Sequence, residues 1–131
     1  MHGDVRKENH AMADLTINSV SVPSAVVNGQ TFSLDVSVTA SADSVEDGSA
    51  YRLFIFVTSL LTGGLLAPPI VTKGHLQESP WITASNLFQF PVTAGSSPDV
   101  YNITAVLLEG PSGTDPDSVP SFSFAGPMVV V

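Results

Sequence analysis

The chain is 131 residues long, the length of one domain, and it lacks cysteine, which excludes disulfides and thiolate chemistry. Its formal net charge of −8 and its four basic residues argue against direct binding to nucleic acid and against docking onto anionic lipid. Hydrophobic residues make up 44% of the chain and charged residues only 12%, so uncharged polar residues must carry most of the surface, as in many extracellular and virion β-proteins.

The first segment, residues 1–12, is polar and mixed in charge, and we interpret it as an arm ahead of a domain that spans residues 13–131. It has no apolar stretch like that of a signal peptide, and no part of the sequence approaches the ~20 apolar residues of a membrane span. The arm contains Arg6 and Lys7, two of the four basic residues. We therefore regard both as candidate contacts to a partner, such as a neighbouring subunit.

Alternating apolar and polar residues predict strands, because successive side chains of a strand point to opposite faces. The clearest case is Phe32–Ala40, where every second residue is apolar. A change of parity at Asn18-Ser19 predicts a β-bulge, and Gly126-Pro127 predicts a break near the end of the chain. The predicted strands are Asp14–Pro23, Thr31–Ala40, Tyr51–Leu61, Ile70–Leu76, Leu87–Val92, Val100–Glu109 and Ser121–Val131.

Loops are predicted at Ser41–Ala50, Leu61–Pro69 and Gly110–Pro120, and no segment shows a helical period. Within Tyr51–Leu61, apolar residues fall on both faces, which implies a central strand or a covered outer face. Seven to eight strands at this spacing predict an all-β fold, an antiparallel sandwich.

Two stretches resemble the immunoglobulin-like (Ig-like) sandwich family. Ala13–Pro23 followed by Val27–Phe32 is similar to bacterial cell-adhesion-related, CARDB-type domains, and Pro98–Ala105 is similar to the tyrosine corner of such sandwiches. The resemblance implies that the Tyr101 hydroxyl ties its strand to the preceding turn, and that the domain binds or spaces other domains. We also expect the Tyr101 strand to partner the Phe32–Ala40 strand.

Polar side chains that could carry chemistry are few. The three histidines, His2, His10 and His75, have no metal-ligand spacing, and no carboxylate pair or Ser-His-Asp pattern predicts an enzyme. Asp115 and Asp117 could bind calcium, but turn chemistry explains them better, and the same holds for the acidic residues of Ser41–Ala50. We therefore expect no cofactor and no metal.

Two apolar features could contact a partner. Trp81 could anchor a protein or stack on a sugar, although a lone Trp more often plugs the end of a sandwich. The connection after the third strand is unusually apolar. Its leucines either cap the core or form a contact patch, namely Leu60, Leu61, Leu65 and Leu66.

The composition and the resemblance favour a non-enzymatic structural protein that acts by protein–protein contacts. Our first hypothesis is a virion component, such as a phage capsid decoration protein, whose partner is the capsid shell or a second copy. The alternative is a bacterial cell-surface adhesion or carbohydrate-binding module with a protein or glycan partner. The inward positions of the strands are plain hydrocarbon, so we expect any activity in the arm, the loops and the edges.

Overall fold

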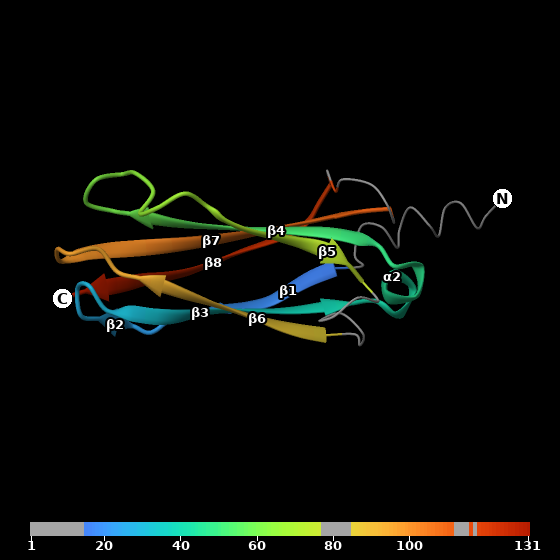
Figure 1. Ribbon diagram of the computed structural model, residues 1–131, viewed down its shortest axis with the longest axis horizontal. Helices are drawn as coiled ribbons and strands as arrows, with labels where there is room; N and C mark the ends of the chain where they lie inside the picture. The colour runs from blue at the N-terminus through green and yellow to red at the C-terminus, as the bar shows by residue number, and fades with distance from the viewer. Residues whose placement is uncertain (1–14, 77–84, 112–115, 117) are drawn as a thin grey trace.

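The computed structural model describes residues 15–76, 85–111, 116 and 118–131. Within these residues the chain forms eight strands in two sheets that pack face to face (Figure 1). The elements are β1 (Leu15–Ser21), β2 (Ala25–Val26), β3 (Thr31–Ala40), α2 (Ala42–Asp47), β4 (Ala50–Ser59), β5 (Ile70–His75), β6 (Ser85–Thr93), β7 (Asp99–Gly110) and β8 (Ser118–Val130). The prediction of an all-β sandwich is confirmed.

One sheet has the strand order β1-β3-β6 and the other β2-β8-β7-β4-β5. All neighbouring strands are antiparallel except β2, which pairs in parallel with β8 over two residues. Because β3 and β7 belong to different sheets, the expected pairing of the Tyr101 strand with the Phe32–Ala40 strand is wrong. Both strands instead bury side chains in the core between the two sheets.

The core lies between the two sheets. Every second residue of β3 is buried from Phe32 to Ala40, as the alternation predicts. Apolar side chains of β4 and β7 meet them from the other sheet, where strand residues of odd number face inward. The largest fully buried side chains are Tyr101, Leu15, Leu34, Leu53, Ile55, Leu76, Ile103, Leu107, Met128, Val36 and Val38.

Two of the three register shifts in the described strands adjust which side chains face inward. The register of β1 against β3 shifts between Ile17 and Ser19, which is the predicted bulge. The register of β7 against β8 shifts opposite Gly126, whose φ of 104° is a conformation that favours glycine. The predicted break at Gly126-Pro127 is therefore a bulge within one continuous strand.

The predicted loop Ser41–Ala50 contains the short helix α2. Its first turn is capped by Ser41, whose hydroxyl accepts a hydrogen bond of 3.0 Å from the Ser44 N–H. It ends at Gly48, which has a left-handed φ of 67°. Six residues are too few to show a helical period in the sequence, and the capping residues were its only signal.

Candidate functional site

The outer faces of the two sheets differ sharply in chemistry. The outer face of β1-β3-β6 is rich in hydroxyl and amide groups that bond to one another; for example, Asn18 Nδ2 lies 2.6 Å from Thr39 Oγ1. The hydroxyls of Thr31 and Thr93 lie 3.0 Å apart on neighbouring strands. The outward-facing polar residues include Thr16, Asn18, Thr31, Ser33, Asp35, Ser37, Thr39, Ser85, Gln89 and Thr93. This hydrogen-bonded surface is typical of a face that stays in water, and we call it the polar face.

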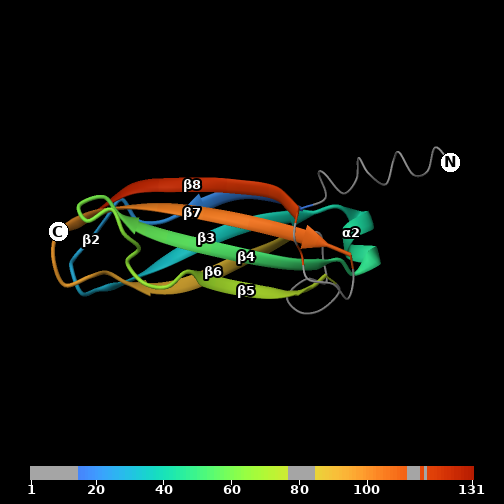
Figure 2. The ribbon, with the colours of Figure 1, turned by 90° about the horizontal axis from the view of Figure 1, so that it is seen from above.

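The outer face of the five-stranded sheet is apolar. Figure 2 looks onto this face, with β8, β7, β4 and β5 lying side by side in that order. The strand register aligns its side chains in rows that cross the sheet, because directly paired residues point to the same face. One row is Val71–Phe54–Val106–Phe122 and the next is Phe56–Thr104–Phe124. We call the surface formed by these seven residues and Leu108 the apolar face.

Several of these side chains project into solvent. Phe122 is 60% exposed, Phe124 is 68% exposed and Val71 is 51% exposed. If a whole Phe side chain presents about 200 Å², these three residues expose on the order of 300 Å². The largest apolar patch on a typical monomeric protein covers about 300–600 Å² and is often functional, which makes this face a candidate interaction site.

The aromatic rings form two ridges along the strands. On β4, the rings of Phe54 and Phe56 stack with centroids 6.3 Å apart and an interplanar angle of 14°. On β8, Phe122 and Phe124 meet edge to face with centroids 5.8 Å apart. The smaller side chains of Thr104 and Val106 on β7 lie between the two ridges. The two aromatic ridges are therefore separated by a row of smaller side chains on β7.

The charges on this side of the sheet are confined to one end. Arg52 pairs with Lys73 across β4 and β5, next to the row that contains Phe54. The Arg52 guanidinium carbon lies 5.9 Å from the centroid of the Phe54 ring, within the range of a cation–π contact. Among the described residues of β4, β5, β7 and β8, the outward-facing positions hold no Asp or Glu.

The connection between β4 and β5, residues 60–69, contains four leucines, and we call it the leucine-rich connection. It lies at the end of the apolar face opposite to Arg52 and Lys73. Leu61 is 70% exposed and Leu65 is 49% exposed, whereas Leu66 packs against the core. Leu65 pairs with Thr58, which points outward on β4. Leu66 therefore covers the core, whereas Leu61 and Leu65 are exposed, and their role as partner contacts stays a prediction.

Ser59 and Asp99 anchor this connection. The Ser59 hydroxyl donates a hydrogen bond of 2.6 Å to Asp99 Oδ2 and accepts one of 3.1 Å from the Thr62 N–H. The hydrogen bond from Ser59 holds the pKa of Asp99 below its ordinary value, and backbone hydrogen bonds from Val100 and Leu61 act in the same direction against the opposing effect of burial. The Asp99 carboxylate thus links β7, to which it belongs, with β4 and the leucine-rich connection.

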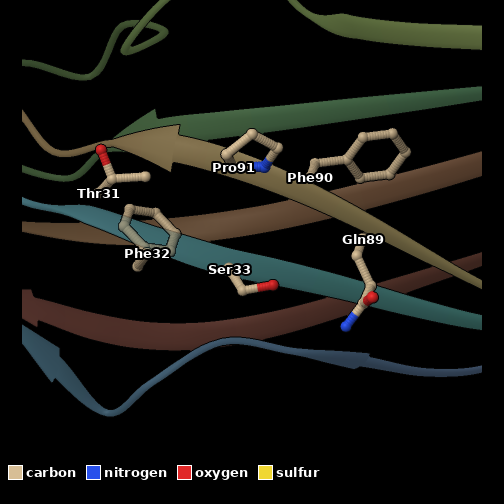
Figure 3. Close-up of a pocket in the computed structure, with 6 residues that line it drawn as sticks. All are labelled: Thr31, Phe32, Ser33, Gln89, Phe90 and Pro91. Carbon is tan, nitrogen blue, oxygen red and sulfur yellow. The ribbon is translucent and has the colours of Figure 1, made fainter.

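A depression of about 340 Å³ lies over β3 and β6 (Figure 3). It is lined by Thr31, Phe32, Ser33, Gln89, Phe90 and Pro91. None of these six side chains titrates near neutral pH, and Phe32 is buried while Phe90 is only partly exposed. The depression therefore offers neither an acid–base pair nor an exposed aromatic platform for a sugar.

Several residues singled out in the sequence lie outside the described part of the chain, namely Arg6, Lys7, Trp81, Asp115 and Asp117. Among the described residues, no three or more His, Asp or Glu side chains gather as a metal site would require. No helix in the described residues is long and apolar enough to cross a membrane.

The apolar face was missed by sequence reasoning, which sought function in the arm, the loops and the edges. Its one signal was the presence of Phe54 and Phe56 opposite the core side of the Tyr51–Leu61 strand. The outward direction of Phe122 and Phe124 had no signal, because their alternation with serines fits either face.

Comparison with solved structures identifies the fold. A β-glucuronidase from Bacteroides uniformis matches with a TM-score of 0.58 and 15% identity over 85% of this chain, which spans 14% of that enzyme. A CARDB domain from Pyrococcus furiosus, solved in complex with di-metal ions, matches with a TM-score of 0.52 and 14% identity over 90% of this chain and 88% of that one. A conjugative transposon lipoprotein from Bacteroides eggerthii gives a TM-score of 0.42 and 16% identity, covering 86% of this chain and 94% of that one.

Neither a protein-family model nor the sequence of a curated protein matches this chain. The two structures with the higher TM-scores show that the chain has an Ig-like β-sandwich fold, similar to a CARDB domain and to an Ig-like region of a β-glucuronidase.

Proposed function

We propose that this domain is a non-catalytic module of a bacterial cell-surface protein and that it binds another protein through the apolar face. The observation that carries the proposal is the projection of Phe122 and Phe124 from β8 into solvent, across β7 from Phe54 and Phe56 on β4. Such exposure costs hydration free energy that contact with a partner would recover. The likeness to a CARDB domain supports an adhesion role over catalysis.

The contrast between the two outer faces supports a protein partner at this particular surface. Several hydroxyl and amide groups of the polar face over β3 bond to one another, whereas the apolar face offers hydrocarbon and aromatic rings, with the Thr104 hydroxyl as its one polar side-chain group. Phe side chains have no polar tip with which to orient a sugar, so the apolar face suits a protein better than a glycan. A glycan role would depend on Trp81, and comparing wild type with Trp81→Ala on a glycan array tests it.

The virion role predicted from the sequence remains a prediction. A capsid shell would be one possible protein partner of the apolar face, and the following experiment would detect it as it would any other.

The proposal is tested by site-specific photo-crosslinking on the source cells. A photoreactive phenylalanine analogue replaces Phe124 in one variant and Leu87 in a matched control, since Leu87 is 53% exposed on the polar face. We expect a discrete protein adduct from position 124 and none from position 87. The absence of any protein adduct at position 124, or equal adducts at both positions, would contradict the proposal.

A further inference from the structure

The apolar face is suited to bind the same face of a second copy of the chain. Resting on the proposed function, we infer that the protein partner at this face is a second copy of the same chain, so that two sandwiches pack through their five-stranded sheets. The interface would be isologous, with the same residues contributed by each copy.

The dimensions of the sheet match those of a stable dimer interface. Strands β4, β7 and β8 contain 10, 12 and 13 residues. At about 3.3 Å per residue and about 4.8 Å between strands, the β8-β7-β4-β5 surface covers roughly 30 by 20 Å, or about 600 Å² before side-chain relief is counted. A standard interface buries about 800 Å² on each partner. One sheet face therefore supplies nearly the whole area that a specific dimer requires.

The aromatic ridges can meet their counterparts on a second copy. The ridge of Phe54 and Phe56 and the ridge of Phe122 and Phe124 are two strand spacings apart, about 10 Å, with the smaller side chains of β7 between them. Packed sheets interdigitate their side chains at a separation of about 10 Å, with their strands within about 30° of each other. A second copy related by a two-fold axis perpendicular to the strands places each ridge opposite the same ridge of the first copy, where the rings can interdigitate along the strands.

The charge distribution decides how the copies can be oriented. Each chain carries a net charge of −8, yet the described outward positions of this sheet hold Arg52 and Lys73 at one end and no acidic residue. A two-fold axis through the middle of the face, perpendicular to the strands, brings apolar centre onto apolar centre. It also keeps the cation pair of one copy away from that of the other. The remaining repulsion is long-range and therefore screened by salt.

Analytical ultracentrifugation of the full-length chain tests the inference. The variants are Phe122→Ser/Phe124→Ser on the apolar face, Phe124→Ser alone, and Leu87→Ser as a control of similar exposure on the polar face. Circular dichroism and thermal unfolding verify that each variant folds. Phe124→Ser provides a readout if the double variant fails to fold, because Phe124 is 68% exposed and its loss opens no core.

We expect the wild type and Leu87→Ser to form dimers, and the double variant to raise the dimer Kd by about 100-fold or more, as for central aromatic contacts. We also expect the wild-type Kd to fall as ionic strength rises. A wild type that stays monomeric at all concentrations, or a double variant that dimerises as tightly as wild type, would overturn the inference. A wild-type monomer combined with a position-124 adduct to a different protein would refute the second copy while leaving the proposed function intact.

Discussion

The Tyr101 hydroxyl accepts a hydrogen bond of 2.8 Å from the backbone N–H of Gly95. The bond ties the start of β7 to the turn that follows β6, and therefore links the two sheets near one end of the sandwich. The Tyr101 side chain is 1% exposed, and the bond is partly buried. A Cβ at position 95 would lie 3.2 Å from the Tyr101 hydroxyl oxygen, which explains the close approach of the glycine backbone.

Replacing Tyr101 with Phe removes the hydroxyl and leaves the Gly95 N–H without this acceptor. We expect the free energy of unfolding to fall by about 1–3 kcal/mol, the cost of an unsatisfied donor that is partly buried. Urea denaturation measures the change, with Ser97→Ala in the same turn as an exposed control. An unfolding free energy equal to that of wild type would show that the hydroxyl does not secure the turn.

The hydrogen bond between Ser59 and Asp99 predicts how the stability of the fold depends on pH. The hydrogen bond from Ser59 lowers the folded-state pKa of Asp99. The ionised carboxylate therefore contributes its full stabilisation at pH values above the unfolded-state pKa of about 4. The contribution is lost as the pH falls through the lowered folded-state pKa. We expect Asp99→Asn to reduce the acid sensitivity of unfolding, measured by urea titrations between neutral and strongly acidic pH.

The cause of this pH dependence is tested by a double-mutant cycle. If the Ser59 hydroxyl lowers the pKa of Asp99, then Ser59→Ala should weaken the same acid dependence. The combined variant should then show little beyond the effect of Asp99→Asn alone. Fully additive changes in the acid dependence would locate its origin elsewhere.

Some features of the fold follow directly from local patterns in the sequence. The alternation from Phe32 to Ala40 predicts both the strand and its buried face, because apolar residues gain from burial. The parity change at Asn18-Ser19 likewise predicts the bulge in β1. These features depend on neighbours along the chain, and for that reason a single sequence reveals them.

Other features depend on partners that are distant in the sequence. Phe122 and Phe124 point outward while Ser121 points toward β1, where its hydroxyl accepts a hydrogen bond of 3.0 Å from the Ile17 N–H. The bulge at Gly126 allows Met128 to be buried nevertheless. Neither constraint is visible locally, because Phe-Ser alternation reads the same for both faces. The apolar face could therefore be recognised only once the register of β7 and β8 was known.

Phe88 and Phe124 test which side chains belong to the core and which to the apolar face. Phe88 is 8% exposed and points into the core, where its ring lies 5.9 Å from that of Tyr51, whereas Phe124 is 68% exposed. We expect Phe88→Ala to lower the unfolding free energy by about 3–5 kcal/mol through the cavity that it leaves. We expect Phe124→Ala to lower it by less than about 1 kcal/mol. Chemical denaturation at low protein concentration measures both, and equal losses would contradict the assignment of Phe124 to the surface.

The cap of α2 provides the last prediction. The Ser41 hydroxyl is the acceptor for the Ser44 N–H in the first turn, and Asp43 in that turn carries the negative charge that a helix N-terminus favours. Ser41→Ala removes the acceptor, and we expect a loss of about 1 kcal/mol in the unfolding free energy. Ser41→Asp restores an acceptor and should recover most of that loss. Hydrogen exchange at the Ser44 amide gives a local readout, and unchanged protection in Ser41→Ala would show that α2 is held by its packing rather than by its cap.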